Sequence, residues 1–443
     1  MTYKEKDIQL PYKEEPKINF FYYPPLKDLE GGKSISIKED LKLDQKMKYI
    51  SLFTIYISIP YCRTRCNSCC CFRGFLPHCD DKEAFMDEYV ECLIRQMHGY
   101  SNKVRFRNAT CAAVYIGGGT ASLLSSRQVK RLIDEIKSIF QVVSDIEINL
   151  EGNPIDFTRE YLESVKEYGV TRVSIGYQSK IPSVLQALNT SHNSEIGSKA
   201  VENAIDIGFH TVNVDLLYNV PGQTFQQWKE DLNSILEYAP ESISAGDYMV
   251  YEGSNADRLI KRGKLPKQHE VDVVNQWYRY ACSLLNENKY SERVRGIFTK
   301  DGHVQQYVKV SCNDSTDIIA LGAGACGFIN GFQFRVTNSS ELFKKQIMNG
   351  KLFEVDSISV HATERNFMER YIIHNLYSEV VKISEFVKRF GAEPLEEFKN
   401  IFDKLLNYGL IEIDNSEIRL TDLGKKWRRS VYYEFHEEKF KIV

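Results

Sequence analysis

The sequence predicts an α/β fold: a partial barrel of six strand–helix units, preceded by an N-terminal arm and followed by a mostly helical, winged-helix-like domain. From residue 50 to about 250, short β-branched runs alternate with amphipathic helical stretches. Such alternation gives right-handed βαβ units and a parallel sheet. Glycine-rich, cysteine-rich and polar motifs follow the expected strands, and barrels of this type carry their chemistry at the C-terminal ends of the strands.

Six strands and five intervening helices are expected in the barrel. The expected strands are Phe53–Ile59, Ala113–Ile116, Ile146–Glu151, Val173–Gln178, Val212–Leu217 and Ile243–Val250. The expected helices lie at about 82–99, 126–140, 158–169, 194–208 and 224–238. A sheet of six such units is expected to curl into an open barrel.

The chain divides into four expected segments. Residues 1–50 are a polar arm, part of which is expected to cover the barrel mouth, and residues 51–255 are the barrel core. Residues 256–355, with a helix at about 268–287, extend the barrel and cap the site. Residues 356–443 form the C-terminal domain, in which Leu410–Leu420 alternates as a hairpin with its turn near Asn415 and Ser416.

Composition narrows the class of protein. The 443 residues are 43% hydrophobic and 26% charged, as is usual for a globular protein, and the net charge is −3. This charge argues against a role in coating nucleic acid or membranes. A helical domain with a β wing can bind DNA, but its basic Arg428 and Arg429 are balanced by nearby glutamates. We therefore expect neither a nucleic-acid nor a membrane partner.

The N-terminus and the apolar runs indicate a cytoplasmic protein. Met1–Asp7 is charged and lacks the apolar region of a signal peptide. No apolar stretch approaches the roughly eighteen residues that a membrane helix needs. The 26 Tyr and 24 Phe could be ordinary core residues or could line a pocket for a flat organic substrate, and composition does not decide between them.

Three cysteines, Cys62, Cys66 and Cys69, have the spacing C-x3-C-x2-C. Cysteine thiolates hold iron–sulfur clusters, and three thiolates leave one iron of a four-iron cube open to bind and reduce a small cofactor. A zinc site usually adds a second cysteine pair or histidines, and neither is apparent. Eleven cysteines, five of them within ten positions, do not resemble a secreted disulfide framework.

This spacing resembles the signature of the radical S-adenosylmethionine (SAM) superfamily. The resemblance implies a [4Fe–4S] cluster whose open iron chelates the amino and carboxylate groups of SAM. One electron from the cluster then cleaves SAM to methionine and a 5′-deoxyadenosyl radical. In such enzymes the cofactor carries the difficult chemistry and the protein positions it. A flavodoxin or a ferredoxin is the kind of electron donor expected.

An ordered set of motifs narrows the resemblance to the oxygen-independent coproporphyrinogen III oxidase (HemN-like) family, over nearly the whole chain. The motifs are Tyr56–Cys62, Gly117–Thr120, Glu151–Pro154, Arg172–Gln178, Val214–Tyr218 with Pro221–Thr224, Leu321–Gly324 and Leu420–Gly424. Each motif alone is weak, since a glycine run can be no more than a tight turn. Their order is specific.

That family binds two SAM molecules, so the resemblance assigns roles residue by residue. Cys62, Cys66 and Cys69 ligate the cluster. The first SAM contacts Tyr56, Gly118 and Glu151; the second contacts Gly119, Thr120, Gln178 and Asp215. Further SAM contacts match Ser68, Met249 and Phe328. Glu151, Gln178 and Asp215 could alternatively be paired polar residues of the barrel rim. A monomer is expected.

The sequence departs from the oxidase in two places. The oxidase carries an arginine where this chain has Thr190, so a guanidinium suited to bidentate carboxylate binding is missing, unless His192 or another group replaces it. The stretch from Cys69 to Pro77 resembles the class C radical SAM methyltransferases instead. Cys71 keeps a fourth cysteine position of the oxidase, and Cys70 has no assigned role.

These departures favour a class C-like enzyme that uses two SAM molecules to methylate or cyclopropanate an sp2 carbon. The expected substrate is flat and unsaturated: a heteroaromatic, an indole, a polyene or a tetrapyrrole. Three alternatives remain open. Oxidative decarboxylation of coproporphyrinogen III is favoured by Cys71 and opposed by Thr190. The others are methyl transfer to haem with ring opening, and haem binding without catalysis, which has no need of an open-iron cluster.

Overall fold

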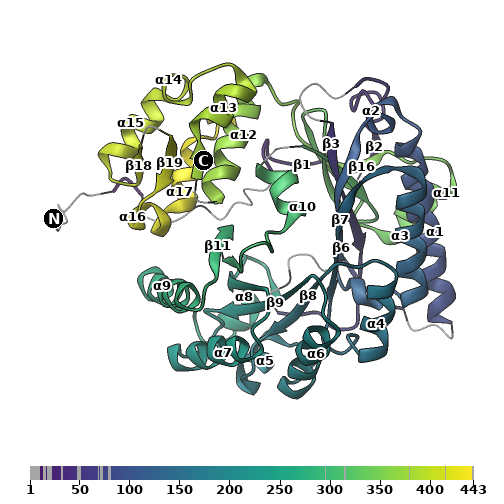
Figure 1. Ribbon diagram of the computed structural model, residues 1–443, viewed down its shortest axis with the longest axis horizontal. Coiled ribbons are helices and arrows are strands. Elements are labelled where there is room, and N and C mark those ends of the chain that lie inside the picture. Colours follow the sequence, from purple (N-terminus) through teal and green to yellow (C-terminus); the bar gives the residue numbers. More distant parts are fainter. Residues whose placement is uncertain are drawn as a thin grey trace.

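The computed structural model describes residues 10–12, 16, 22–30, 33–46, 51–67, 69, 73–77, 81–294, 296–313, 316–378, 380–414 and 416–441 (Figure 1). The predicted SAM contact Ser68, the cysteines Cys70 and Cys71, and the predicted turn residue Asn415 lie outside these ranges.

Six parallel strands form the centre of the structure and confirm the predicted α/β barrel. In spatial order they are β3 (Leu52–Ile59), β6 (Thr110–Gly118), β7 (Gln141–Gly152), β8 (Arg172–Gln178), β9 (Thr211–Tyr218) and β10 (Ser242–Asp247). The helices that connect them lie on the outer side (Figure 1): α1 (Lys82–Ser101), α2 (Val104–Arg107), α3 (Ser126–Ile139), α4 (Arg159–Glu167), α5 (Pro182–Leu188), α6 (Ser194–Ile207) and α7 (Phe225–Tyr238).

Two details differ from the sequence-based expectation. The sixth strand ends at Asp247, because its partner β9 ends at Tyr218 directly opposite; Met249 therefore lies beyond the strand and not within it. Helix α5 was not predicted. It has only seven residues and begins with Pro182, so it is too short to show a clear helical period.

The sheet continues beyond the barrel on both sides. Strand β13 (Asp317–Leu321) pairs in parallel with β3, and β14 (Cys326–Ile329), β15 (Phe332–Val336) and β16 (Glu354–Ile358) follow antiparallel. At the other end, β12 (Ile297–Thr299) and β11 (Ser291–Val294) extend β10. The arm contributes β1 (Lys27–Asp28) and β2 (Ile35–Ser36), which both pair with β16.

Helices join these additional strands, and a separate core forms the C-terminal domain. The joining helices are α8 (Asn255–Lys261), α9 (Val271–Glu287), α10 (Gln306–Val308) and α11 (Ser340–Met348). The domain packs α12 (Glu364–Tyr377), α13 (Ile383–Phe390), α14 (Pro394–Glu397), α15 (Lys399–Asn407), α16 (Asp422–Lys426) and α17 (Arg428–Glu434) around a three-stranded sheet.

The predicted hairpin in the C-terminal domain is confirmed. Strands β18 (Ile411–Ile413) and β19 (Glu417–Leu420) pair antiparallel, and β17 (Val380–Lys382) adds the third strand. At the turn, the Asp414 carboxylate accepts hydrogen bonds from the backbone N–H groups of Ser416 and Glu417, each at 2.8 Å. This contact fixes the turn without a tight glycine loop.

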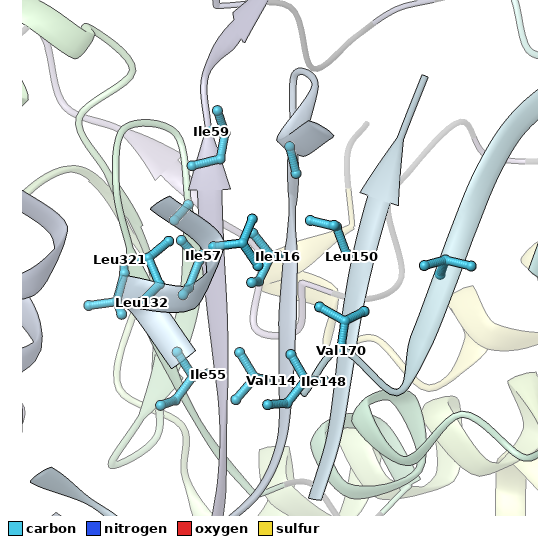
Figure 2. Close-up of a cluster of buried hydrophobic side chains, with 14 of the residues drawn as sticks. Ile55, Ile57, Ile59, Val114, Ile116, Leu132, Ile148, Leu150, Val170 and Leu321 are labelled. Atoms are coloured by element: carbon cyan, nitrogen blue, oxygen red, sulfur yellow. The ribbon is translucent and has the colours of Figure 1, made fainter. Parts of the chain in front are cut away.

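Alternation along the parallel strands separates the core from the barrel interior. Ile55, Ile57 and Ile59 of β3 are fully buried against the outer helices, with matching residues on β6 and β7 (Figure 2). The residues between them point to the opposite face of the sheet because side chains alternate along a strand. That face carries polar groups, among them Tyr56 and Glu151, so the same pattern that builds the core also places polar residues inside the barrel.

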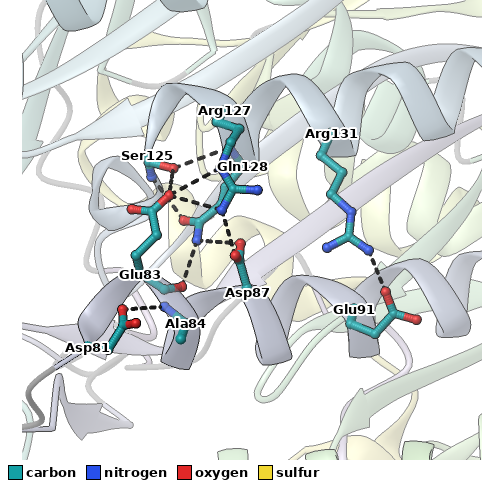
Figure 3. Close-up of polar contacts among 9 residues, drawn as sticks. All are labelled: Asp81, Glu83, Ala84, Asp87, Glu91, Ser125, Arg127, Gln128 and Arg131. Carbon is teal, nitrogen blue, oxygen red and sulfur yellow. Dashed lines mark hydrogen bonds and ion pairs between the residues drawn. The ribbon is translucent and has the colours of Figure 1, made fainter.

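The two longest helices beside the first strands are joined by a polar network (Figure 3). Arg127 of α3 contacts Glu83 of α1 at 3.1 Å and Asp87 at 2.5 Å, and Arg131 pairs with Glu91. The side chains are largely exposed, so each pair is worth about 0–1 kcal/mol. The network therefore aligns α1 with α3 more than it stabilises the fold.

A buried ion pair joins helix α2 to strand β13, the neighbour of β3. Arg105 of α2 donates from Nη2 to Asp317 Oδ1 of β13 at 3.0 Å and from Nε to Oδ2, and both side chains are more than nine-tenths buried. Asp317→Ala leaves the guanidinium buried and unpaired. We expect it to lower the free energy of unfolding, measured in urea, by about 3–5 kcal/mol.

The matched control removes both charges. Arg105→Met with Asp317→Leu fills the site with apolar groups, so it should cost much less than Asp317→Ala. An equal loss in the single and the double variant would contradict this account of the pair.

Candidate functional site

A cavity of about 250 Å³ lies at the C-terminal ends of the parallel strands. It brings together eight of the predicted site residues: Cys62, Cys66, Cys69, Gly119, Thr120, Glu151, Gln178 and Asp215. Thr190 and His192 also line it. None of the described residues of the N-terminal arm does; they pair with β16, pack on the C-terminal domain or, as Ile37, Leu41 and Leu43 do, pack in the main hydrophobic core.

The other predicted contacts lie outside the cavity lining. Tyr56 and Gly118 are close beneath it, through their contacts with Glu151 and Tyr115. Met249 follows the end of β10 and does not line the cavity. Phe328 is fully buried, with its ring 4.0 Å from the guanidinium of Arg370. The assignment of these four residues to SAM stays a prediction.

Glu151, at the end of β7, is held by a tyrosine pair. Tyr115 donates its hydroxyl hydrogen to Glu151 Oε1, and the ring of Tyr56 stacks on Tyr115 with 5.8 Å between centroids. The Gly118 backbone N–H also donates to the carboxylate. Burial nevertheless raises the pKa of Glu151 to about 7, and the nearby Asp215 adds to the rise. The carboxyl is therefore poised between its two protonation states near neutral pH.

Close contacts explain two glycines of the run Gly117–Thr120. A Cβ on Gly117 would lie 2.4 Å from Glu151 Oε2, so the carboxylate occupies the space that a side chain needs. A Cβ on Gly119 would lie 2.7 Å from the Tyr61 carbonyl and 2.9 Å from Cys62 Sγ. The run therefore lets the backbone approach both the carboxylate and the first cysteine.

Asp215 points into the cavity from β9 and is oriented by its neighbours. Asn213, on the same strand face, donates from Nδ2 to Asp215 Oδ1 at 2.8 Å, and Ser244 of β10 also donates to the carboxylate. Ser242 fixes the amide of Asn213 by donating to its Oδ1 at 2.7 Å. Burial raises the pKa of Asp215, while these donors and the nearby Arg172 oppose the rise.

Gln178 lies at a tight turn that a buried carboxylate stabilises. Its φ of 65° is in the left-handed region, which is unusual for a residue with a side chain. Asp231 of α7 accepts hydrogen bonds from Ser179 Oγ at 2.8 and 2.9 Å and from the Lys180 N–H at 2.7 Å. Burial raises the pKa of Asp231 to about 7. These contacts hold the turn that presents Gln178 to the cavity.

The three cysteines fit an iron–sulfur cluster by their chemistry. All are free thiols that line the same cavity. Burial and the neighbouring sulfurs raise the pKa of Cys66 to about 11, so the group that binds here must supply positive charge to deprotonate the thiols, as metal ions do. Within the described residues, no three Cys, His, Asp or Glu side chains converge on a single metal ion, and a cluster with separate irons does not require this.

Around the position where the oxidase has an arginine, the side chains of Thr190 and His192 bond to backbone carbonyls. The Thr190 hydroxyl donates to the His192 carbonyl at 3.1 Å. His192 Nε2 lies 3.0 Å from the Tyr177 carbonyl, which can only accept, so Nε2 carries the hydrogen. Nδ1 is then a lone-pair acceptor; it is buried and has no hydrogen-bond partner within the described residues. Burial lowers the pKa of His192, which keeps the ring neutral.

Several site residues were missed by the sequence analysis. Tyr115 and Asn213 orient the two cavity carboxylates, and Asp231 supports the Gln178 turn. A signal for the first two exists: Tyr115 lies two positions before Gly117 and Asn213 two positions before Asp215, so each lies on the same strand face as a motif residue. Asp231 lies on a helix and carries no such signal.

The sequence and the fold were compared with known proteins. The profile of the radical SAM superfamily matches residues 56–235. The chain is 26% identical to the heme chaperone HemW of Bacillus subtilis (strain 168) over 385 residues, which cover 86% of this chain and 98% of that protein. It is 23% identical to anaerobilin synthase of Escherichia coli O157:H7 over 390 residues, 86% of this chain and 83% of that one.

The fold is similar to that of a solved structure, coproporphyrinogen III oxidase (HemN) from Escherichia coli. The TM-score is 0.75 at 20% sequence identity, and the match covers 89% of this chain and 92% of the other. Within the described residues, no helix combines the length and the apolar character needed to cross a membrane. The superfamily profile and the relatives agree: the chain is similar in sequence to the radical SAM superfamily and to HemW and anaerobilin synthase, and it shares the fold of HemN.

Proposed function

We propose that the chain uses two SAM molecules to transfer a SAM-derived carbon to an sp2 carbon of a flat, unsaturated substrate, giving a methylated or cyclopropanated product. The match of residues 56–235 to the superfamily profile implies a [4Fe–4S] cluster and SAM. The cluster, when bound, supplies the electron that cleaves SAM to a 5′-deoxyadenosyl radical. Cys62, Cys66 and Cys69 ligate it, and their common cavity supports this assignment.

Two carboxylates in one cavity support two SAM sites. Glu151 lies beside the glycine run that approaches Cys62, so it suits a ligand on the open iron. Asp215 and Gln178 come from the next strands along the sheet and suit a second, adjacent ligand. Ionised carboxylates accept hydrogen bonds from ribose hydroxyls and from ammonium groups, both of which SAM carries.

The observation that carries the choice of carbon transfer is the scarcity of cationic side chains among the described residues that line the cavity. Decarboxylation of a propionate side chain calls for a group that binds its carboxylate, and arginine is the usual one. Thr190 cannot supply it. Arg63 is the one arginine among the described lining residues, and it pairs with Asp156 at 2.5 Å. The cavity therefore suits a substrate that is not held by a carboxylate.

A tetrapyrrole is the substrate class that the relatives favour. The named relatives are a heme chaperone, an anaerobilin synthase and a coproporphyrinogen III oxidase. A haem carrier is the second candidate function, because HemW proteins are relatives whose lengths this chain largely spans. The three-cysteine motif and the carboxylates behind it favour an enzyme, since haem carriage alone uses neither.

SAM affinity should depend on pH through Glu151. Its pKa of about 7 in the ligand-free protein means that the accepting carboxylate is mostly protonated at pH 6 and mostly ionised at pH 8. We expect the Kd of SAM for the anaerobically reconstituted protein to fall roughly tenfold over this range. In Glu151→Gln the dependence should be flat. A wild-type Kd that does not change with pH would contradict the role of Glu151.

Asp215→Ala should weaken the second SAM site alone. The loss of one charge-assisted contact should cost roughly 1.5–3 kcal/mol of binding free energy. Calorimetric titration of the cluster-loaded protein should find two SAM molecules per chain in the wild type and one tight site in the variant. Asp145→Ala, an exposed aspartate of β7, is the control and should keep both sites. One SAM per chain in the wild type would exclude the two-SAM proposal.

The fate of a labelled methyl group tests the reaction. With methyl-deuterated SAM and a reductant, turnover should give 5′-deoxyadenosine and S-adenosylhomocysteine together, with deuterium in the deoxyadenosine. Cys69→Ala, which lacks one proposed cluster ligand, should form neither product. Coproporphyrinogen III and haem should be supplied in parallel assays. Conversion of coproporphyrinogen III to protoporphyrinogen IX, with loss of carbon dioxide and no S-adenosylhomocysteine, would replace this proposal by the oxidase.

A further inference from the structure

Asn67 lies between the second and third cysteines and is 6% exposed. Every hydrogen-bonding group of this residue is used. Its N–H donates to the Leu188 carbonyl at 2.9 Å, and its Nδ2 donates to the Ala187 carbonyl at 2.8 Å. Its Oδ1 accepts from Asn255 Nδ2 at 2.6 Å, and its carbonyl accepts from the Ala256 N–H at 3.3 Å. A residue of this kind is fixed in both backbone and side chain.

These partners are the ends of two helices. Ala187 and Leu188 are the last residues of α5, and Asn255 and Ala256 are the first residues of α8. Helix ends leave carbonyl and N–H groups without partners inside the helix. Asn67 therefore caps the C-terminus of one helix and the N-terminus of another, although it is 120 and 188 residues away in sequence.

The two helices follow strands on the far side of the barrel from the cysteine loop. The loop follows β3, whereas α5 follows β8 and α8 follows β10; two strands lie between β3 and β8 along the sheet, and four lie between β3 and β10. Asn189, next to α5, adds a hydrogen bond from Nδ2 to the Arg65 carbonyl at 2.9 Å. The contacts of Arg65 and Asn67 therefore span the barrel mouth and join the cysteine loop to the segment that leads into Thr190 and His192.

We infer that Asn67 is a positioning residue that fixes the cysteine loop across the barrel mouth. The cluster bound by this loop is thereby held over the cavity that contains Gln178 and Asp215. The inference rests on the cluster part of the proposed function and is independent of carbon transfer. An apolar side chain here leaves the Ala187 carbonyl and the Asn255 amide without their partner, and the loop loses its side-chain attachments to both helices while the backbone ones remain.

The test compares Asn67→Ala with Asn203→Ala. Asn203 of α6 is also 6% exposed and donates one hydrogen bond, to the Phe157 carbonyl, away from the cysteine loop. Iron per chain is measured first after anaerobic reconstitution, and then the rate at which a chelator removes iron. We expect Asn67→Ala to lose iron at least fivefold faster than the wild type, a factor that one hydrogen bond supplies. The electron paramagnetic resonance spectrum of the reduced cluster with SAM should also change. Asn203→Ala should change neither.

Two milder variants cover the case in which Asn67→Ala does not fold. Asn67→Asp keeps the acceptor for Asn255 and loses the donor to Ala187, and Asn255→Ala leaves the loop sequence intact and removes one partner. Both should lose iron faster than the wild type, and hydrogen exchange of the cluster-free proteins should accelerate at residues 185–190 and 255–258.

Iron loss at the wild-type rate in both, or an equal acceleration in Asn203→Ala, overturns the inference. A wild-type protein that binds no iron overturns the cluster as well, whereas a protein that holds iron but transfers no methyl carbon refutes only the proposed reaction.

Discussion

The two-residue period of the parallel strands is the constraint on which the rest of the structure depends. In β3, β6 and β7 one set of alternate residues is isoleucine, leucine or valine, fully buried against the outer helices. The other set faces the barrel interior and includes Tyr56, Tyr115 and Glu151. A shift of one residue in strand register would move every apolar side chain to the wrong face. The hydrophobic core therefore fixes the positions of the cavity residues, although it makes no contact with a ligand.

Polar side chains inside a barrel are costly unless they have partners. Glu151 is paired with Tyr115 and Asp215 with Asn213, yet burial still raises the pKa of both carboxyls. Arg172, fully buried beneath them, donates to Ser242 Oγ at 3.0 Å and offsets part of this negative charge. Burial therefore disfavours the ionised form of the cavity carboxyls, and a cationic ligand offsets this cost. SAM brings positive charge, and this explains why such a site is stable enough to fold and is still prepared to bind.

The sequence predicted the parts of the fold and of the site that local patterns determine. The six parallel strands, the outer helices and the C-terminal hairpin follow from period-two and helical patterns, and eight predicted residues line one cavity. The resemblance, rather than any pattern, assigned those residues to a cluster and to SAM. The strands β13 to β16, which complete the sheet beside β3, were not placed from the sequence, because pairing across some 260 residues leaves no local signal.

Asn67 shows why the remaining parts of the site could not be predicted. In the sequence it is an unremarkable residue between two cysteines, and its partners Ala187 and Asn255 carry no motif. Only the folded chain places one helix C-terminus and one helix N-terminus beside it. The same holds for His192: the Tyr177 carbonyl accepts a hydrogen bond from Nε2, and this contact leaves Nδ1 as the acceptor nitrogen of the ring.

The polarity of the cavity links these observations to the choice of ligand. Glu151 and Asp215 present carboxylate oxygens, whereas Arg63, the one arginine in the described lining, pairs with Asp156. A ligand that carries ammonium, sulfonium or hydroxyl groups matches this lining, and a ligand held by its carboxylates does not. Thr190 therefore affects which substrate the cavity can bind. Because the oxidase family also binds two SAM molecules, this difference bears on the substrate: a propionate side chain finds no guanidinium at position 190.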